Sequence, residues 1–298
     1  MRAYVTGASG FVGTWLCRHL RDEGDEVLAP FVDIADAVAL RASLRDVAPD
    51  VVYHLAGQAH VGASWTDPAG TFAVNATGTL HLLEAARTLA SRPRVMIVSS
   101  AEVYGAVGLA DLPVREDHPL APVSPYAASK AAAEFLGLQA WLGYSLEVIR
   151  TRAFNHVGIG QSDQFVVSGV ARQVALAEQD GAEAVVRVGN LSARRDVSDV
   201  RDVVRAYRAL MVDGVPGAVY NVCSGVDVGI DELVDRLVSL AQRRIDVVVD
   251  PARVRPVDVP VLRGDPSALV AATRWSPRHG LDATLGAVLD DWRFRLRA

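Results

Sequence analysis

The chain has 298 residues, half of them hydrophobic, and carries 30 lysines and arginines against 35 aspartates and glutamates, for a formal net charge of −5. At roughly 150 residues per domain, this length predicts one large domain or two closely joined ones, and the negative charge argues against a nucleic-acid-binding surface. No apolar run reaches the roughly 18 residues that span a membrane, so we expect a cytoplasmic protein without a signal peptide. The two cysteines, Cys17 and Cys223, indicate buried thiols in a reducing compartment.

Strand and helix patterns alternate through the first half of the chain. Strands are expected at residues 2–6, 27–29, 51–55, 94–100 and 146–151. Helices are expected between them, at residues 10–23, 35–47, 71–90 and 125–142. This alternation predicts an α/β fold in which helices cover both faces of a parallel sheet.

The strict alternation breaks from about Gly158 onward. Helices are expected at residues 162–178, 197–211, 229–242 and 283–296, and one strand at 184–188. We therefore expect a first domain at residues 1–157, to which residues 186–224 partly return. Residues 158–185 and 225–298 would form a smaller C-terminal substrate-binding lobe.

A glycine-rich turn follows the first expected strand, in the sequence Thr6-Gly7-Ala8-Ser9-Gly10-Phe11-Val12-Gly13. Glycines at this spacing permit a tight turn, let the backbone approach a pyrophosphate, and let the helix pack closely on the strand. The free N–H groups at the start of the helix then face the phosphates. In its strand–turn–helix context the motif predicts dinucleotide binding by a Rossmann-type doubly wound sheet, and the alternative is an ordinary strand–helix turn.

Residues suited to ligand binding also follow the other expected strands. Ligands of parallel sheets bind at the carboxyl ends of the strands. The residues at or just after those ends are Gly7, Asp33, Ala56, Ser100 and Phe154. Each alone is compatible with ordinary loop chemistry, but their joint placement indicates a cofactor cleft.

Lys130 is the only lysine of the chain, since every other basic residue is an arginine. Lysine and arginine differ in shape more than in charge, so a lysine kept at one position indicates a role that geometry decides. It follows Tyr126 by four residues, which on a helix places both side chains on one face. A nearby ammonium stabilises a phenolate, so we expect the pKa of Tyr126 to lie below its usual value of about 10. The alternative is a surface tyrosine and lysine on an ordinary helix.

Together with Ser99-Ser100-Ala101-Glu102-Val103-Tyr104-Gly105, the glycine turn and the tyrosine–lysine pair resemble the extended short-chain dehydrogenase/reductases. The sugar-nucleotide branch is indicated by Arg152-Ala153-Phe154-Asn155-His156-Val157-Gly158-Ile159-Gly160-Gln161 and supported by the segments 188–191, 194–196 and 220–225. Within this branch the chain most resembles the GDP-4-keto-6-deoxy-D-mannose reductases, which make GDP-D-rhamnose, and next the GDP-mannose 4,6-dehydratases. The resemblance covers essentially the whole chain.

The resemblance implies a nicotinamide cofactor, NADP(H) or NAD(H). Its pyrophosphate would lie on the glycine turn, at Gly7, Gly10, Phe11, Val12 and Gly13. The remaining cofactor contacts would be Asp33 and Ile34 at the adenine, Leu55, Ala56 and Gly57 on the nicotinamide side, and Phe154.

The resemblance also implies the catalytic and substrate-binding residues. Tyr126 would be the catalytic acid, Ser100 would hydrogen-bond the reacting oxygen, and Lys130 would hold the nicotinamide ribose. The sugar nucleotide would be bound by Ser100, Glu102, Asn155, Arg195, Arg255 and Asp258. No metal site is expected, because the histidines lack metal-ligand spacing.

Two departures from the family pattern leave alternatives open. The second strand ends at Pro30-Phe31, with neither an acid nor an arginine to contact the adenosine ribose, so the sequence does not decide between NAD and NADP. Glu102 and the segment 58–61 resemble the dehydratases, which use a glutamate at that position as a C5 proton shuttle. The alternative activities are a GDP-mannose 4,6-dehydratase or a sugar-nucleotide 4-epimerase and, more remotely, a non-enzymatic NADP-sensing protein.

Members of the extended family pair two long helices into a four-helix bundle, so we expect a homodimer through residues 71–90 and 125–142. The second of these helices offers Ala128, Ala131, Ala132, Phe135, Leu138 and Leu142 as an apolar face, and the first offers Leu82, Leu83 and Ala86. The alternative is a monomer in which these residues form one wide core face.

Overall fold

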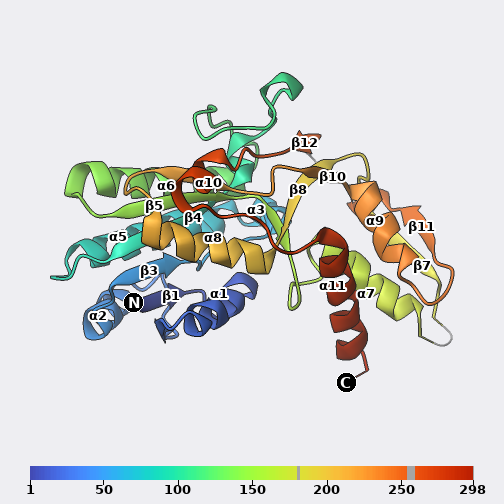
Figure 1. The fold of residues 1–298 in the computed structure, drawn as a ribbon, viewed down its shortest axis with the longest axis horizontal. Coiled ribbons are helices and arrows are strands. Elements are labelled where there is room, and N and C mark those ends of the chain that lie inside the picture. Colours follow the sequence, from blue (N-terminus) through green and yellow to red (C-terminus); the bar gives the residue numbers. More distant parts are fainter. Residues whose placement is uncertain (180–181, 254–258, 298) are drawn as a thin grey trace.

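The computed structural model describes residues 1–179, 182–253 and 259–297 (Figure 1). The helices are α1 (Phe11–Asp22), α2 (Ala37–Val47), α3 (Val61–Thr66), α4 (Pro68–Phe72), α5 (Gly78–Arg87), α6 (Pro125–Tyr144), α7 (Val166–Ala177), α8 (Val200–Asp213), α9 (Ile230–Ser239), α10 (Ser267–Thr273) and α11 (Leu281–Arg295). The strands are β1 (Arg2–Thr6), β2 (Glu26–Leu28), β3 (Val51–His54), β4 (Arg94–Ser100), β5 (Val148–Ala153), β6 (Asn155–Val157), β7 (Val185–Val188), β8 (Arg194–Asp199), β9 (Val219–Val222), β10 (Asp227–Gly229), β11 (Asp246–Val249) and β12 (Val261–Leu262). Among the described residues, no helix is both long and apolar enough to cross a membrane.

Six parallel strands form the main sheet, in the order β2-β1-β3-β4-β5-β9. Helices α1, α8 and α10 pack on one face, and α2, α5 and α6 on the other. The α/β fold with a doubly wound parallel sheet is therefore confirmed. The strand order reverses between β1 and β3, and ligands of such sheets bind in the crevice at the carboxyl ends of the strands beside that switch point.

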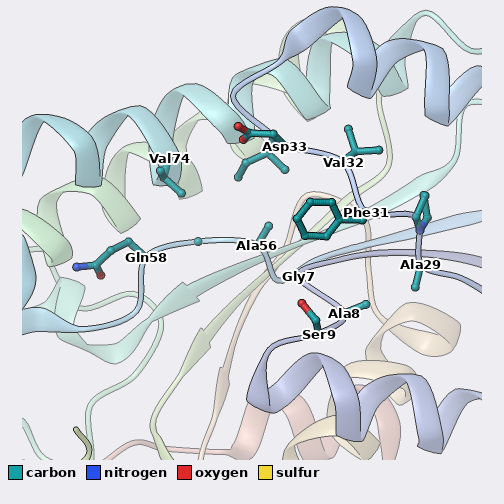
Figure 2. A pocket seen from close by; sticks show the side chains of 13 residues that line it. Gly7, Ala8, Ser9, Ala29, Phe31, Val32, Asp33, Ala56, Gln58 and Val74 are labelled. Atoms are coloured by element: carbon teal, nitrogen blue, oxygen red, sulfur yellow. The ribbon is translucent and has the colours of Figure 1, made fainter. Parts of the chain in front are cut away.

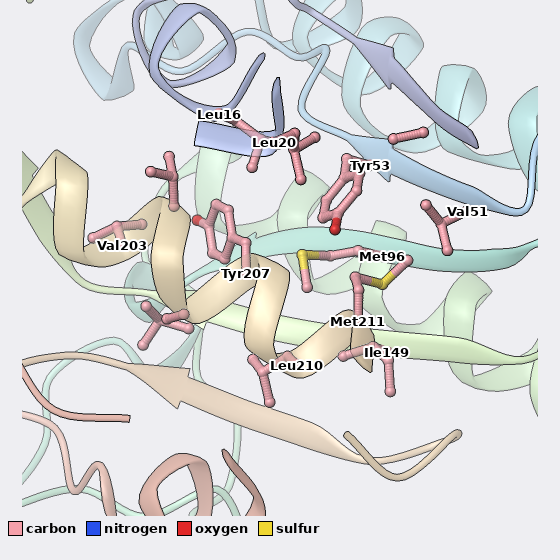
Figure 3. Close-up of a cluster of buried hydrophobic side chains, with 14 of the residues drawn as sticks. Leu16, Leu20, Val51, Tyr53, Met96, Ile149, Val203, Tyr207, Leu210 and Met211 are labelled. Atoms are coloured by element: carbon pink, nitrogen blue, oxygen red, sulfur yellow. The ribbon is translucent and has the colours of Figure 1, made fainter. Parts of the chain in front are cut away.

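The two faces of the sheet are buried in separate apolar cores, because each covering helix has one apolar side. In the first core, Leu16 and Leu20 of α1 and Tyr207 and Leu210 of α8 pack against Met96 of β4 and its neighbours (Figure 3). The second core holds residues of α2, α5 and α6 on the opposite face, namely Leu40, Leu44, Leu82, Leu83, Ala86, Ala133 and Ala140.

The second half of the chain builds a smaller part with a core of its own. Helices α7, α9 and α11 enclose apolar side chains around Trp292 and lie together at the end of the molecule away from α2 and α5 (Figure 1). Strand β8 pairs with β6, β10 and β12, and β7 pairs with β11. Strand β9 instead joins the large sheet beside β5.

Four expected helices differ from those observed. The helix expected at 162–178 begins at Val166, and the one expected at 229–242 ends at Ser239. The helix expected at 71–90 is divided into α4, a π-helical turn at Ala73–Thr77, and α5. The π turn contains Asn75, whose side chain bonds residues far away in the sequence, and such turns hold one extra residue within a helix. The helix expected from residue 197 begins at Val200, because residues 194–199 form β8 and the Asp199 carboxylate accepts the Arg201 N–H at 2.8 Å as the helix cap.

A buried ion pair fixes α6 against the sheet. The Glu134 carboxylate on α6 accepts two hydrogen bonds from Nε and one from Nη2 of Arg152 on β5, at 2.7–3.2 Å, and both side chains are at most 6% exposed. Arg152 Nη1 also donates to the Tyr104 hydroxyl at 2.8 Å, and that hydroxyl donates to Asn221 on β9 at 2.7 Å. These contacts connect α6 to the segment after β4 and to the far edge of the sheet.

Replacing Glu134 by glutamine should destabilise the protein by about 3–5 kcal/mol, because Arg152 would remain buried without its counter-charge. Urea unfolding at fixed protein concentration measures the change. Glu183→Gln is the control, since Glu183 pairs with Arg187 on the surface at 3.2 Å and its side chain is 68% exposed. Equal unfolding midpoints for the two variants would contradict the assigned role of Glu134.

Candidate active site

A cavity of about 510 Å³ lies at the switch point of the sheet (Figure 2). Five of the residues expected to contact a cofactor line it: Gly7, Asp33, Ile34, Ala56 and Gly57. Eight further lining residues were not expected from the sequence: Ala8, Ser9, Ala29, Pro30, Phe31, Val32, Gln58 and Val74. Most of these are neighbours in the chain of the expected residues, and only that proximity in the sequence could have predicted them. Val74 lies in the π turn, which was not expected.

The glycine turn brings the ends of β1 and β3 into backbone contact. Gly7 has φ +67°, and a Cβ atom on it would lie 2.7 Å from the Ala56 nitrogen. A Cβ on Gly13 would overlap the Gly7 carbonyl oxygen, so the first turn of α1 packs directly on the loop. Gly10 caps α1 without a side chain, and the first turn contains no acid. The free N–H groups at this helix start therefore form a site for an anion.

His54, at the end of β3, is buried at the centre of a chain of hydrogen bonds. The Thr79 hydroxyl donates to the Asn75 carbonyl at 2.6 Å, so its oxygen must accept from His54 Nε2, 3.0 Å away. Nδ1 then carries no proton and accepts from the Thr6 hydroxyl at 2.8 Å, whose oxygen accepts the Ala56 N–H at 3.1 Å. This assigns a neutral ring protonated at Nε2. Burial, with a smaller effect of the Lys130 charge, lowers the pKa of His54 to about 3.

Asn75 extends the same chain to α6. Its side-chain oxygen accepts the Gln58 N–H at 2.8 Å, and its Nδ2 donates to the Gln58 carbonyl and, at 2.9 Å, to the Ser129 hydroxyl. The Ser129 hydroxyl in turn donates to the Tyr126 carbonyl at 2.7 Å. Continuous hydrogen bonds thus link the wall of the cavity to the backbone of Tyr126.

Ser100, Tyr126 and Glu102 come together at the carboxyl end of β4. Ser100 is 8% exposed and accepts the Glu102 N–H at 3.2 Å. Burial raises the pKa of Tyr126 to about 12, the nearby Ser100 hydroxyl opposes this, and the Glu102 charge adds to it. The prediction of a lowered pKa is wrong for the protein alone, because burial and the Glu102 charge both raise the pKa and only Ser100 opposes them. The phenol is therefore protonated at neutral pH.

Lys130 lies beside the cavity wall. Its Nζ donates to the Val98 carbonyl at 2.9 Å, and burial lowers its pKa to about 8. A Cβ on Gly57 would lie 3.4 Å from this Nζ and 2.9 Å from the Asn75 side-chain oxygen. Glycine at position 57 thus leaves the space through which the ammonium reaches the edge of the cavity.

The other expected site residues lie farther from the cavity lining. Phe11 stacks on His156 with ring centroids 6.1 Å apart, and Phe11, Val12 and Leu55 pack against the first core. Phe154 is 3% exposed and packs beside Tyr104 and Cys223 in a separate apolar cluster, and a buried ring there leaves little surface for a cofactor.

The residues expected to bind the substrate lie partly on two neighbouring strands. Asn155 is exposed on β6, which pairs with β8, and β8 carries Arg195. Arg195 is 7% exposed, and its Nη1 donates to the Val259 carbonyl at 2.6 Å and the Arg194 carbonyl at 2.9 Å. Arg255 and Asp258 lie outside the described residues.

Comparison with known proteins gives consistent results along the whole chain. The family model of GDP-mannose 4,6 dehydratase matches residues 30–287. The GDP-6-deoxy-D-mannose reductase of Pseudomonas aeruginosa is 40% identical over 99% of this chain and 98% of its own length. A GDP-mannose 4,6-dehydratase of Vibrio cholerae is 28% identical over 92% of this chain and 89% of its own length. The structure of RMD from Pseudomonas aeruginosa complexed with NADPH has a TM-score of 0.92 and 38% identity, with 99% of each chain covered. The UDP-glucose 4-epimerase of Thermus thermophilus complexed with NAD has a TM-score of 0.87 and 29% identity, and the match covers 98% of this chain and 99% of the epimerase chain.

His54→Leu should destabilise the protein by about 1–3 kcal/mol at neutral pH, because the buried Thr6 hydroxyl loses its acceptor. The loss should depend on pH. Unfolded histidine binds a proton below about pH 6.5, whereas folded His54 stays neutral down to about pH 3, so wild type should lose about 1.4 kcal/mol per pH unit below 6.5 from this group. The leucine variant lacks this contribution.

The difference in stability between wild type and His54→Leu should therefore shrink as the pH falls from 7 to 5. Urea unfolding at several pH values measures it. A difference that stays constant over that interval would show that His54 is not buried in the neutral form.

Proposed function

The chain belongs to the GDP-mannose 4,6-dehydratase family of extended short-chain dehydrogenase/reductases, and we propose that it reduces a nucleotide-linked 4-keto-6-deoxyhexose with NAD(P)H. The substrate proposed is GDP-4-keto-6-deoxy-D-mannose and the product GDP-D-rhamnose. The observation that carries the proposal is the protonated, buried Tyr126 beside Ser100, in a chain that resembles a reductase over its full length. Reduction of a carbonyl needs a proton donor, and a phenol with a raised pKa remains a donor at neutral pH.

The residues around the cavity fit a dinucleotide. The backbone at Gly7 and Gly13 leaves no room for a Cβ, and the start of α1 offers N–H groups to a pyrophosphate. The cavity continues from there to Gly57, beside Lys130, on one side and to Ala29 and Ile34 on the other. We assign the nicotinamide half to the Lys130 side, because the candidate catalytic residues lie there.

A nicotinamide held beside Lys130 and Gly57 would supply the hydride for the reduction. Tyr126 would donate its proton to the sugar oxygen as negative charge develops there, and Ser100 would hydrogen-bond the same oxygen. Lys130 would hold the nicotinamide ribose, as its place beside Gly57 supports. The hydrogen bonds through Asn75 and Ser129 hold the Tyr126 backbone in place before the substrate arrives.

We further propose that Asn155, Arg195, Arg255 and Asp258 bind the GDP portion. The backbone carbonyls of Arg194 and Val259 hold the Arg195 guanidinium in one position, and the planar fork of a guanidinium suits the oxygens of a diphosphate. In this proposal residues 1–157 form the cofactor domain, and the part of the chain around α7, α9 and α11 forms the substrate lobe. The free, buried cysteines are compatible with the proposed location in the cytoplasm.

A second candidate is the dehydratase activity, which Glu102 favours. Its charge affects Tyr126, so the carboxylate lies near the reacting position, as an acid–base group for the sugar would. A dehydratase restores its cofactor within each turnover, whereas a reductase consumes NAD(P)H.

We also propose a homodimer through α4, α5 and α6. Phe135 and Leu142 on α6 are 57% and 72% exposed, and Phe72 on α4 and Leu80 on α5 are each 38% exposed. Helix α6 packs against α4 and α5, so these side chains belong to neighbouring helices. Leu82, Leu83 and Ala86, which the sequence analysis assigned to the interface, are instead buried against the sheet, because that side of α5 forms the second core.

The test of the function is absorbance at 340 nm with GDP-4-keto-6-deoxy-D-mannose. We expect NAD(P)H to be consumed in equal amount to the GDP-D-rhamnose formed, and Tyr126→Phe to lower kcat by about 10²–10⁴-fold with the affinity for NADPH nearly unchanged. Product formed from GDP-mannose with no net change at 340 nm would establish the dehydratase instead. Residual Tyr126→Phe activity close to that of wild type would remove Tyr126 from the proposed mechanism.

The test of the dimer is light scattering at micromolar concentration, where a monomer has a mass of 31.8 kDa. We expect about twice that mass, and we expect Phe135→Asp to give the monomer because a charge would be buried in an apolar interface. Phe294→Asp is the matched control, since Phe294 is 73% exposed on α11. A wild-type mass near that of the monomer would contradict the proposal.

A further inference from the structure

The chain passes from the proposed cofactor domain to the proposed substrate lobe at residues 158–161, directly after β6; we call this segment the crossing. Gly160 in the crossing has φ +88°, a backbone angle that glycine adopts readily. Strand β6 carries Asn155 and pairs with β8, which carries Arg195. A shift of the crossing would therefore move both strands that present residues to the proposed substrate.

Hydrogen bonds hold the crossing from the side of the substrate lobe. The Trp292 indole N–H on α11 donates to the Ser168 hydroxyl on α7 at 2.9 Å, and that hydroxyl donates to the Gln161 carbonyl at 2.8 Å. The Gln161 side chain in turn donates to the His156 carbonyl on β6 at 2.9 Å. These bonds connect the crossing and β6 to the helices of the lobe.

From the side of the cofactor domain, the crossing is held by α1, the helix whose first turn forms the proposed pyrophosphate site. The Trp15 Nε1 donates to the Ile159 carbonyl at 2.9 Å. Phe11 stacks on His156 with ring centroids 6.1 Å apart, and a Cβ on Gly158 would lie 3.6 Å from the Phe11 ring. Residues four apart lie on the same side of a helix, so one face of α1 contacts both β6 and the crossing.

Helix α1 is itself fixed relative to the cavity. Its first turn packs directly on the glycine turn, and Leu16 and Leu20 are buried in the first core. Trp15 packs against the same core, and the guanidinium carbon of Arg18 lies 5.9 Å from the centre of its ring. An indole has one donor that points in a fixed direction, so its hydrogen bond to a carbonyl defines an orientation as well as a distance.

We propose that Trp15 is a positioning residue for the sugar nucleotide. Its hydrogen bond to Ile159 fixes β6 relative to the bound cofactor, and β6 with its partner β8 carries Asn155 and Arg195. The inference rests on the proposed function, in which those two residues bind the GDP portion. The candidate catalytic residues lie on β4 and α6, which other contacts hold, so loss of the bond should affect nucleotide binding and leave the chemical step unchanged.

The first experiment measures binding of GDP and of UDP to the full chain saturated with NADPH, by isothermal titration calorimetry. Trp15→Phe keeps an aromatic ring and removes the indole N–H. It should weaken binding of the nucleotide that wild type prefers by about 3- to 10-fold, the usual effect of one lost hydrogen bond. The affinity for NADPH, measured without nucleotide, should equal that of wild type, because the glycine turn is unchanged.

Trp275→Phe is the matched control. The Trp275 indole also donates to a backbone carbonyl at 2.9 Å, that of Asp202, but this bond joins the segment after α10 to α8. Both variants lose a bond of the same kind and length, and nucleotide binding should weaken in Trp15→Phe alone. An unchanged nucleotide affinity in Trp15→Phe would overturn the proposal, and so would an equal loss in Trp275→Phe. Weaker NADPH binding in Trp15→Phe would also overturn it, since Trp15 would then act on the cofactor site.

The second experiment is steady-state turnover of the 4-keto sugar nucleotide at saturating NADPH. Trp15→Phe should raise KM by about the same 3- to 10-fold with kcat unchanged, because the nucleotide contacts are made equally in the ground state and the transition state. A fall in kcat with KM unchanged would overturn the proposal.

The binding measurements are independent of sugar turnover. If wild type binds a nucleotide but reduces no 4-keto sugar, the proposed function fails, and the comparison of Trp15→Phe with Trp275→Phe still decides the role of Trp15. If wild type binds neither nucleotide, the assignment of Trp15 fails.

Discussion

The contact between the ends of β1 and β3 is the constraint on which the rest of the site depends. Gly7 lies so close to the backbone of Ala56 that any side chain on Gly7 would collide with it. The Thr6 hydroxyl also joins the two strands, because it accepts the Ala56 N–H and donates to the His54 ring. The hydrogen-bond directions allow only one tautomer, and burial keeps the ring neutral. A protonated ring would place two donors between two hydroxyls, one of which already gives its proton to the Asn75 carbonyl. The hydrogen bonds among Thr6, His54 and Thr79 therefore have one set of donors and acceptors, which rotation of a single side chain cannot change.

Helix α6 is held from two directions, which explains how an alanine-rich helix can present catalytic side chains in one orientation. On the cavity side, Asn75 and Ser129 connect it to the loop after β3. On the other side, Glu134 binds Arg152, which in turn connects to Tyr104 and the segment that follows Ser100. Alanine packing is tolerant of small shifts and rotations, whereas buried charged hydrogen bonds are not. Lys130 lies between these two anchors, and Tyr126 lies three residues before Ser129, whose hydroxyl bonds its carbonyl, so the geometry of both is set before any ligand binds. That preorganisation suits a reaction in which the protein's main contribution is to stabilise charge on one oxygen.

The charged side chains of the site lie where the proposed ligands would carry charged or polar groups. The lone lysine stands beside the cavity at the end assigned to the nicotinamide, and Arg195 stands on β8 near the residues expected to bind the sugar nucleotide. The opposite end of the cavity is apolar apart from Asp33. In a protein with a net charge of −5, anionic ligands must be bound by such local groups and by backbone N–H groups at the start of α1, since the overall field repels them.

The sequence by itself determined those features that depend on neighbours in the chain: the strand–turn–helix at residues 2–22, the alternation that makes a parallel sheet, and the helix that carries Tyr126 and Lys130 on one face. Backbone sterics and local periodicity act over a few residues, so they are visible in the sequence. The tertiary structure decided what depends on distant partners. Asn75 lies in a π turn because Gln58 and Ser129 bond its side chain, and the pKa of Tyr126 rises because other elements bury it. Leu82 and Leu83 face the core and not the surface for the same reason: which side of a long apolar helix is covered depends on what packs against it, and that is fixed only when the chain has folded.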